Sequence, residues 1–255
     1  MKVSIITTSY NRKKTIEYAI KSVLSQSYKD IEYIIIDGAS KDGTMDVVNK
    51  YRSRITTVIS EPDNGMYEAI NKGISFATGD IVGILHSDDL FYGDDTIAKV
   101  VEAFNQSDAD IVYGNGIYIA NDSRGKVKRI YSVTEYKDRY LYFGWIPLHT
   151  TIYAKRDVFE TYGLYDPNYS IASDYEISLR WFTNTKIKKH FLNDFLVKMR
   201  LGGKSTSASL QKKKSVEDYS IIKEYKLSGY FTLACKIARK IPQYLAPFFK
   251  KEFQV

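Results

Sequence analysis

The sequence predicts an α/β fold in which a mainly parallel, Rossmann-like central sheet is covered by helices on both faces. Short apolar runs alternate with segments of helical apolar spacing over the first 115 residues. These runs are continuous, as in Ile34-Ile35-Ile36, which is typical of strands buried on both faces of a parallel sheet. A chain of 255 residues can bury a substantial core in such a fold.

The elements follow in order along the chain. We expect strands at residues 2–8, 31–37, 56–60, 80–85 and 111–114, alternating with helices at 15–25, 44–51, 66–77 and 96–104. Beyond Gly116 we expect a hairpin of residues 116–120 and 127–131, strands at 151–154, 187–191 and 197–201, and helices at 158–162, 175–182, 210–226 and 230–240. Pro242 and Pro247 should interrupt any helix that follows. Ligands of such sheets bind beyond the carboxyl ends of the strands.

Composition favours a protein of a reducing compartment. The single cysteine, Cys235, allows no internal disulfide. The first residues, Met1–Ile6, are too short and too strand-like for a signal peptide. No apolar stretch reaches the roughly 18–20 residues that a membrane span needs. We therefore expect a cytoplasmic protein.

Charge is uneven along the chain. The net charge is +7, but residues 186–255 hold 16 Lys and Arg against 5 Asp and Glu. That segment therefore has a local charge of +11, which leaves −4 for the rest. The positive charge belongs to the C-terminal quarter, where anionic lipid or nucleic acid could meet it.

The first predicted strand ends in Thr8-Ser9-Tyr10-Asn11. A dinucleotide-binding protein would have a Gly-x-Gly-x-x-Gly turn here, and its absence disfavours a nicotinamide or flavin enzyme. Tyr10 suits stacking on a nucleoside base while Thr8 hydrogen-bonds to it. The alternative is that Ser9 or Asn11 only caps the following helix.

Two further segments suit a nucleotide. The second strand ends at Asp37, whose carboxylate can accept a hydrogen bond from a base or ribose, while Asp42 suits a turn or helix cap. The segment from Glu61 to Gly73 enters a helix whose free N–H groups suit a diphosphate, with Asp63 at its start and Asn71 inside it. The alternative is that Asp63 caps this helix.

Adjacent carboxylates follow the fourth predicted strand. Asp88 and Asp89 come directly after a buried run, where two like charges repel and need a partner. A divalent cation removes this difficulty, and carboxylate oxygens suit Mg²⁺ or Mn²⁺. His86 stands nearby but a lone histidine is more often structural. The alternative is an acidic loop that caps the helix near Asp94-Asp95.

Asp174 begins another predicted helix, in Ala172-Ser173-Asp174-Tyr175-Glu176. A carboxylate in this position could take a proton from an acceptor hydroxyl, or it could cap the helix. The residues alone do not separate these two interpretations.

The order and spacing of these motifs resemble family 2 glycosyltransferases of GT-A fold. The resemblance rests on Ile36-Asp37-Gly38-Ala39-Ser40, Glu61-Pro62-Asp63-Asn64-Gly65, Ala69-Ile70-Asn71-Lys72-Gly73 and Ser87-Asp88-Asp89. The stretches His149–Arg156, Gly163–Asp166 and Ala172–Glu176 look like the subgroup that builds bacterial surface polysaccharides such as O antigens. The resemblance covers about residues 2–205.

The resemblance implies a role for each matched residue. It implies a nucleotide-sugar donor, with UDP as the nucleotide that the family favours, a divalent cation, and inversion at the anomeric carbon. Donor-binding positions are Thr8, Tyr10, Asp37, Asp63, Asn71 and Asp88; Asp89 and Asp88 would hold Mn²⁺ or Mg²⁺. Asp174 matches the catalytic base, and His149, Glu176 and Arg180 would contact the acceptor or support the base.

The resemblance also divides the chain. Residues 1–115 would form the nucleotide-sugar-binding half, 116–205 the acceptor-binding and catalytic half, and 206–255 a basic helical C-terminal extension. A Gly/Ser loop at residues 202–207 would be a lid over the donor or a plain surface loop.

The C-terminal segment 229–255 mixes aromatic residues with cations. It resembles a helix lying on an anionic membrane surface, on the cytoplasmic face of the inner membrane, and would suit an acceptor saccharide carried on a polyprenyl lipid. The alternative is a helix packed on the domain with a solvated basic face. No nucleic-acid-binding module occurs, so we expect no nucleic acid partner.

Two other functions compete with transfer of a sugar. A sugar nucleotidyltransferase has a similar layout but would carry a Gly-rich, basic loop after the first strand, which Thr7–Arg12 lacks. A non-catalytic saccharide- or lipid-binding protein of the same fold would not need Asp88, Asp89 and Asp174 together.

Overall fold

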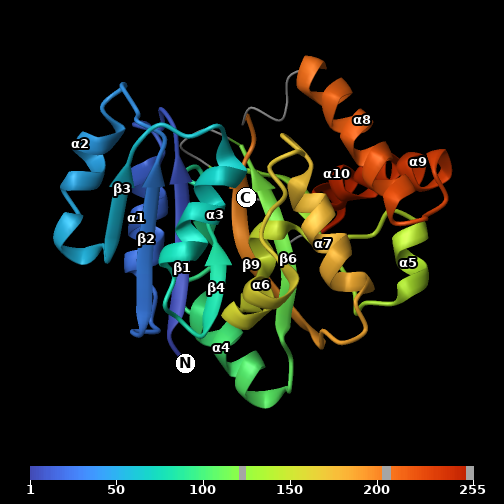
Figure 1. Cartoon of the computed structure of the whole chain (residues 1–255), viewed down its shortest axis with the longest axis horizontal. Coiled ribbons are helices and arrows are strands. Elements are labelled where there is room, and N and C mark those ends of the chain that lie inside the picture. Colours follow the sequence, from blue (N-terminus) through green and yellow to red (C-terminus); the bar gives the residue numbers. More distant parts are fainter. Residues whose placement is uncertain (121–124, 203–207, 251–255) are drawn as a thin grey trace.

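The computed structural model describes residues 1–120, 125–202 and 208–250, which form one nine-stranded sheet with helices on both faces (Figure 1). The strands are β1 (Val3–Ser9), β2 (Ile31–Asp37), β3 (Thr57–Ser60), β4 (Ile81–Ile84), β5 (Leu90–Phe91), β6 (Ile111–Ile119), β7 (Val127–Tyr131), β8 (Ile152–Lys155) and β9 (Lys189–Arg200). The helices are α1 (Ile16–Leu24), α2 (Thr44–Asn49), α3 (Met66–Phe76), α4 (Thr96–Gln106), α5 (Asp138–Tyr142), α6 (Arg156–Tyr162), α7 (Ser173–Thr183), α8 (Ala208–Glu224), α9 (Tyr230–Ala238) and α10 (Lys240–Phe249).

The strand order is β3-β2-β1-β4-β8-β6-β9-β5, and β7 pairs with β6 outside this path. Strands β1 to β4 pair in parallel, as the sequence predicts. The antiparallel strand β8 separates β4 from β6, and β6 then pairs in parallel with β9. The mainly parallel α/β fold is confirmed, and the carboxyl ends of β1, β2, β3 and β4 meet at one edge.

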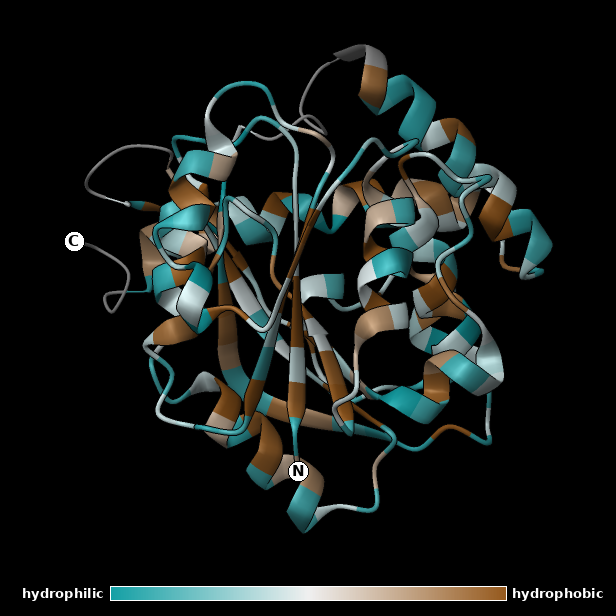
Figure 2. Ribbon diagram, turned by 60° about the vertical axis from the view of Figure 1, so that its left-hand side comes forward, coloured by the Kyte–Doolittle hydropathy of each residue, from teal (hydrophilic) through white to brown (hydrophobic). Residues whose placement is uncertain are grey.

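Two apolar layers hold the helices to the sheet. Alternate side chains of each strand point to opposite faces, so Ile5 and Ile35 pack with α1, α2 and α4 whereas Ile6 and Ile34 pack with α3, α6 and α7. Figure 2 shows the hydrophobic residues along the strands and the hydrophilic residues mainly on the outer sides of the helices. The helices on both faces are thus fixed by the strand alternation.

Gly83 in β4 is required by the packing across the sheet. A Cβ atom at this position would lie 2.5 Å from Cε1 of Tyr153 in β8. Because both residues are buried in the centre of the sheet, Gly83→Ala should lower the free energy of unfolding by about 1–3 kcal/mol. Urea denaturation measures this change. Gly93→Ala serves as the comparison, because its added Cβ atom would meet only the carboxylate of Asp95, an exposed side chain that can move aside. Equal stability of Gly83→Ala and the parent would contradict the packing.

Four details of the predicted elements were wrong. Residues 111–119 form one strand with irregular register near Asn115, where the sequence suggested a strand followed by a separate hairpin arm. Likewise β9 is a single strand that replaces two predicted ones. The short elements β5 and α5 were not predicted. Finally, α10 continues past both prolines. Pro242 lies in its first turn, where an N–H has no helical partner, and Pro247 lies inside the helix, two residues before its end.

The C-terminal helices pack on the domain beside α7 and β7 (Figure 1). Ile221 and Ile222 of α8 are fully buried in the core layer that contains α7. The hydroxyl of Thr232 in α9 donates to the carbonyl oxygen of Tyr142, the last residue of α5, 2.9 Å away. Among the described residues, no helix has the length and apolar character required to cross a bilayer.

Candidate active site

Asp37 joins the carboxyl ends of three neighbouring strands. Its fully buried carboxylate accepts hydrogen bonds from the hydroxyls of Ser9 at 2.8 Å and Ser60 at 2.7 Å, and from the backbone N–H of Ser40 at 2.9 Å. These strand ends are close together because β1, β2 and β3 are parallel. Both oxygens of Asp37 are therefore occupied by the protein itself, and its carboxylate shapes the edge of the sheet.

The side chains of Tyr10 and Asp63 both lie against Gly38, which directly follows Asp37. A Cβ atom on Gly38 would be 2.7 Å from Oδ2 of Asp63 and 3.3 Å from Cδ2 of Tyr10. Half of the Tyr10 surface is exposed, whereas Thr8 is buried in β1. The structure thus brings the predicted donor residues from three loops to one place, with an aromatic ring on the outside.

Asn71 of α3 makes its hydrogen bonds to a different segment, the one between α6 and α7. Its amide donates to the carbonyl oxygen of Tyr165 at 2.7 Å and accepts from the N–H of Tyr165 at 3.0 Å. The side chain therefore binds the segment between α6 and α7 in place. Sequence analysis placed Asn71 among the donor ligands and did not indicate this partner.

Asp88 and Asp89 follow β4 in a tight turn. The N–H of Asp89 donates to the carbonyl oxygen of His86 at 3.0 Å, and Oδ1 of Asp89 accepts from the N–H of Arg200 at 3.2 Å. Asp89 is 2% exposed, and its Oδ2 has no hydrogen-bond partner among the described residues. Burial, followed by the charge of Asp88, raises the pKa of Asp89 well above its usual range.

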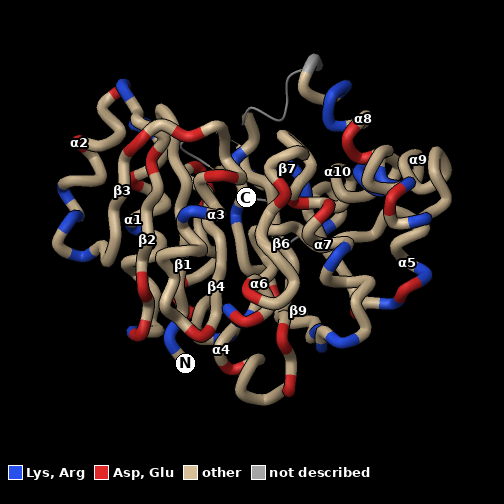
Figure 3. Tube along the Cα trace, in the orientation of Figure 1, with Lys and Arg blue, Asp and Glu red and all other residues tan. Residues whose placement is uncertain are grey.

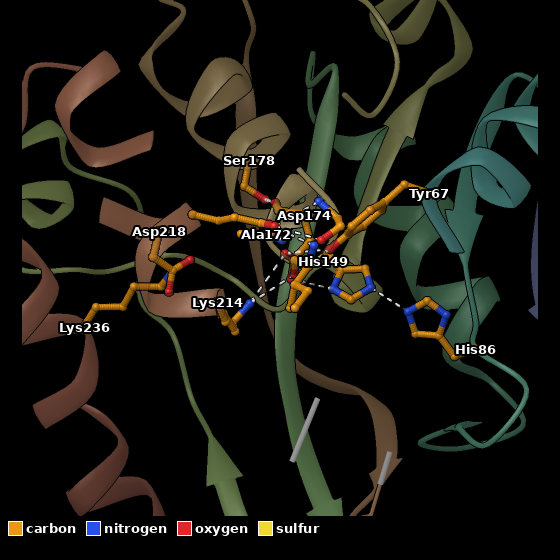
Figure 4. A network of polar contacts seen from close by, with 12 residues as sticks. Tyr67, His86, His149, Ala172, Asp174, Ser178, Lys214, Asp218 and Lys236 are labelled. Carbon is orange, nitrogen blue, oxygen red and sulfur yellow. Dashed lines mark hydrogen bonds and ion pairs between the residues drawn. The ribbon is translucent and has the colours of Figure 1, made fainter. Parts of the chain in front are cut away.

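Asp174 lies on the first turn of α7 and faces the sheet (Figure 4). Its Oδ1 accepts a hydrogen bond of 3.0 Å from the hydroxyl of Tyr67, and Nζ of Lys214 is 3.8 Å from the same oxygen. Nδ1 of His149 is 3.5 Å from the other oxygen, Oδ2. A quarter of the Asp174 side chain is exposed, so the carboxylate is partly accessible.

The helix-cap interpretation of Asp174 is wrong. Helix α7 begins at Ser173 with Ala172 at the N-cap position, and no side chain caps it. The carboxylate is instead directed at side chains from α3, α8 and the short 3₁₀ segment His149–Thr151 before β8. The carboxylate therefore binds side chains of other elements and not the N-terminus of its own helix.

Two histidines link Asp174 to the turn that contains the acidic pair. Nε2 of His149 is 2.6 Å from Nε2 of His86 (Figure 4). Two N–H groups cannot face each other at this distance, so one ring donates and the other accepts. If His149 directs its Nδ1–H at Asp174, its Nε2 accepts from His86. Burial and then His149 lower the pKa of His86 to about 3, which keeps this ring neutral.

The charge state of Asp174 is set by the charge of Lys214 and by the hydrogen bond from His149. Burial opposes ionisation, but Lys214 and then His149 hold the pKa of Asp174 well below its usual range. Tyr67, whose pKa is raised by burial and by Asp174, remains a hydrogen-bond donor. The carboxylate is therefore ionised and held in one orientation.

Glu217 of α8 fixes the loop that leads to Asp174. Its carboxylate accepts from the N–H groups of Ile171 and Ala172, both at 2.9 Å, and from the hydroxyl of Ser170 at 2.8 Å. The sequence did not predict the roles of Glu217 and Lys214, because the residue pattern of a basic helix does not indicate which side chains face the protein interior. The triplet Lys212-Lys213-Lys214 was the one signal present.

Glu217→Gln should weaken this loop anchor, because an amide accepts more weakly than a carboxylate that receives several N–H and O–H groups. We expect the free energy of unfolding to fall by about 1–3 kcal/mol, measured by urea denaturation. Glu102→Gln is the matched control, since Glu102 on the exposed side of α4 accepts only from Gln106. Equal losses in both variants would mean that Glu217 does not anchor the loop.

Glu176 and Arg180 form a pair outside this cluster. Nε of Arg180 donates to Oε1 of Glu176 at 3.0 Å, and the hydroxyl of Tyr225, the residue directly after α8, donates to the same oxygen at 2.7 Å. Nη1 of Arg180 donates to the carbonyl oxygens of Tyr162 and Leu164. The pair thus connects α7 to α6 and to the residue that follows α8.

The lid predicted at residues 202–207 lies outside the described residues except for Gly202. The other predicted site residues separate into two groups. Tyr10, Asp37 and Asp63 gather at the ends of β1 and β2, while His149 and Asp174 meet next to the turn of Asp88 and Asp89.

The residues fit a divalent cation at the acidic pair. Oδ2 of Asp89 has no hydrogen-bond partner among the described residues, and a carboxylate oxygen is a suitable metal ligand. A buried negative charge costs free energy, and a bound cation would lower that cost. No group of three acidic, histidine or cysteine ligands occurs in the described part of the chain. Phosphate oxygens and water are the further ligands that such a cation commonly takes.

The family model for glycosyl transferase family 2 matches residues 4–163, which is more than half of the chain. The chain belongs to glycosyl transferase family 2. An uncharacterized glycosyltransferase of Mycobacterium tuberculosis is 33% identical over 181 residues, covering 70% of this chain and 68% of its own. A PGL/p-HBAD biosynthesis glycosyltransferase of Mycobacterium bovis is 28% identical over 194 residues, covering 74% of this chain and 73% of its own.

Solved structures of low sequence identity share the glycosyltransferase's fold. TarS of S. aureus matches with a TM-score of 0.68 and 18% identity over 88% of this chain, but this chain spans only 39% of TarS. A mannosyltransferase of Pyrobaculum calidifontis, solved with GDP-Man and Mn²⁺, has a TM-score of 0.62 and 17% identity, covering 93% of this chain and 73% of its own. The GT-A type α/β architecture is thereby confirmed.

Proposed function

We propose that this glycosyltransferase inverts the anomeric carbon while it moves a sugar from a nucleoside diphosphate, UDP, to a saccharide or lipid-linked saccharide. The reaction would serve the synthesis of cell-surface polysaccharide. One observation carries the proposal: the chain His86–His149–Asp174 joins the turn of the acidic pair to an ionised, partly exposed carboxylate. Donor phosphates at the first end and a base at the second are what such a transfer requires.

Asp174 is the proposed base. Its partly exposed carboxylate takes the proton of the acceptor hydroxyl as the hydroxyl oxygen bonds to the anomeric carbon. The bond between the anomeric carbon and the diphosphate oxygen breaks, and the nucleoside diphosphate leaves with the electron pair. Sugar transfers of this kind pass through an oxocarbenium-like state, which an adjacent carboxylate also stabilises. His149 and Tyr67 hold the base in orientation.

The donor would lie along the edge formed by β1, β2 and β4. Tyr10 suits stacking on the base with Thr8 and Asp63 nearby. Asp37 and Asn71 act through the strand ends and the segment that they fix. Asp89 and Asp88 would hold Mn²⁺ or Mg²⁺, which supplies charge neutralisation for the departing diphosphate. Residues 1–115 form this donor half, and residues 116–205 form the acceptor half in the proposal.

Release of nucleoside diphosphate tests the proposed function. The protein is incubated with UDP-, GDP- and dTDP-sugars, with Mn²⁺ or with a chelator, and the products are separated. We expect metal-dependent release of UDP, and proton NMR of the transferred sugar should show the inverted anomer. Release of pyrophosphate would instead indicate a sugar nucleotidyltransferase. Binding of saccharide without turnover of any donor would indicate a non-catalytic protein.

A further inference from the structure

The C-terminal helices α9 and α10 expose large apolar side chains on their outer side. The chain stays helical between them, because Arg239 has helical dihedral angles and its N–H donates to the carbonyl oxygen of Cys235 at 2.9 Å. The exposed residues recur mostly at intervals of four, which places them along one side of a helix. They are Tyr230, Phe231, Ile237, Ile241, Leu245 and Phe249. We call this surface the α9–α10 apolar face.

The opposite side of the same helices is polar and faces the protein. Lys236 pairs with Asp218 of α8 at 2.7 Å, and Oε1 of Gln243 accepts from Nε of Arg129 in β7 at 2.8 Å. A surface helix of a globular protein ordinarily buries its apolar side and exposes its polar side. Here the two sides are reversed, so the apolar side is available to something other than the core of this domain.

A second segment of the chain broadens this face. Phe143, the half-exposed residue directly after α5, lies with its ring centroid 5.7 Å from that of Phe231. Tyr142 beside it is exposed as well. Within the face itself, Tyr230 is 72%, Ile241 62% and Phe249 79% exposed. A patch of this kind on a soluble domain marks a surface that binds another protein or a membrane.

The charge of the same segment is positive. Residues 226–255, a count that includes the last five residues, hold six Lys and Arg against a single acidic residue, Glu252. Figure 3 shows Lys and Arg along the C-terminal helices. The acidic side chains of α8 are engaged elsewhere: Glu217 with the loop before α7, Asp218 with Lys236, and Glu224 with the hydroxyl of Tyr169. The apolar face is therefore accompanied by an excess of cations.

This charge decides between the partners that an apolar face could have. In a two-fold dimer of this chain, the same positive segment would meet its own copy, and like charges oppose such contact. Interfaces between proteins are also depleted in lysine. An anionic lipid surface attracts lysine and arginine, and its headgroup region accepts aromatic and aliphatic side chains from a helix that lies flat on it.

We propose that the α9–α10 apolar face, together with Tyr142 and Phe143, lies on the surface of a membrane that contains anionic lipid. The proposal uses no residue of the candidate active site, so it does not depend on the proposed reaction. Helix α8 connects the two regions, because its Lys214 lies 3.8 Å from Asp174 and its Asp218, one turn later, pairs with Lys236 of α9. Docking would thus hold Asp174 at a fixed place relative to the lipid surface.

Flotation of the full chain with lipid vesicles tests this proposal. One set of vesicles contains phosphatidylcholine alone, and the other contains phosphatidylglycerol in addition. We expect binding mainly to the second set. The double variant Ile241→Ser with Phe249→Ser should bind these vesicles at least about tenfold more weakly, because two apolar side chains no longer enter the lipid. Lys250→Gln should weaken binding about fivefold through the loss of one charge.

Matched controls carry the same changes outside the face. Phe76→Ser alters an exposed aromatic residue at the end of α3, and Lys50→Gln alters an exposed lysine after α2, at the opposite end of the molecule from α9 (Figure 1). Both should bind vesicles as the parent does. Circular dichroism checks that every variant is folded.

Three outcomes would overturn the inference. They are absence of binding to the anionic vesicles, equal binding to both sets of vesicles, and equal binding by the parent and the double variant. Light scattering of the vesicle-free protein identifies the other occupant: a parental dimer that the double variant dissociates would assign the face to a second copy of the chain. Because neither measurement needs a sugar donor, a failure of sugar transfer would leave both results readable.

Discussion

Asp174→Asn should lower the turnover number for sugar transfer by about 10²–10⁴-fold, because the amide cannot take the proton of the acceptor hydroxyl. Donor binding should persist, since the carboxylate lies at the acceptor end of the histidine pair and not at the acidic pair. The measurements are the rate of nucleoside diphosphate release with acceptor present and the dissociation constant of the donor. The fold should survive, because the amide oxygen can still accept from Tyr67.

Asp157→Asn provides the control for this change. Asp157 is an exposed carboxylate in the first turn of α6, so its substitution removes the same charge away from the cluster. It should transfer sugar at the parental rate. If Asp174→Asn kept more than a tenth of the parental turnover number, another group would be the base.

Asp89→Asn should abolish metal-dependent donor binding while it raises the stability of the protein without metal. The unpartnered, buried Oδ2 of Asp89 costs free energy in the absence of a cation. Replacing this charge with a neutral amide should raise the free energy of unfolding by about 1–3 kcal/mol. Functional sites commonly store such a cost. Oδ1, which accepts from Arg200, has an equivalent in the amide oxygen.

Thermal unfolding with and without Mn²⁺ and UDP measures both effects. The parent should gain stability when metal and nucleotide are added together, whereas Asp89→Asn should gain none. Asp95→Asn is the control, because Asp95 is exposed and its partner Lys99 keeps a second ion pair with Asp194. If Asp89→Asn were less stable than the parent in the absence of metal, Asp89 would not be a ligand whose charge a cation has to neutralise.

The first half of the fold could be predicted from the sequence because its signals are local. Continuous apolar strands such as Ile34-Ile35-Ile36 and helices with regular apolar spacing fixed β1 to β4 and their helices within a few residues. Beyond Gly116, neighbours in the sheet come from distant parts of the chain. β8 inserts between β4 and β6, and β9 pairs with β6 over its length, so local patterns could not reveal their extent.

The site was predictable to a similar degree. The sequence singles out Asp88, Asp89 and Asp174, because a charged carboxylate at the end of a buried strand or at the start of a helix needs a binding partner. The residues that orient Asp174 do not stand out: Tyr67 belongs to an ordinary helical face, and Lys214 to a run of lysines. Their roles depend on the docking of α8 against α7, which is a tertiary contact without a sequence signature. His149 was named, but its contact with His86 became visible only in three dimensions.

Because Glu217 of α8 anchors the loop before α7, a chimera of two related glycosyltransferases has to take this loop and α8 from the same parent. The family model ends at residue 163, before Asp174 and before α8. A chimera that replaced only the helices after residue 207 would sever the bonds between Glu217 and Ile171 and Ala172. Acceptor specificity should therefore be transplanted as one block from residue 164 to the C-terminus, and natural recombination that separates α7 from α8 should be selected against.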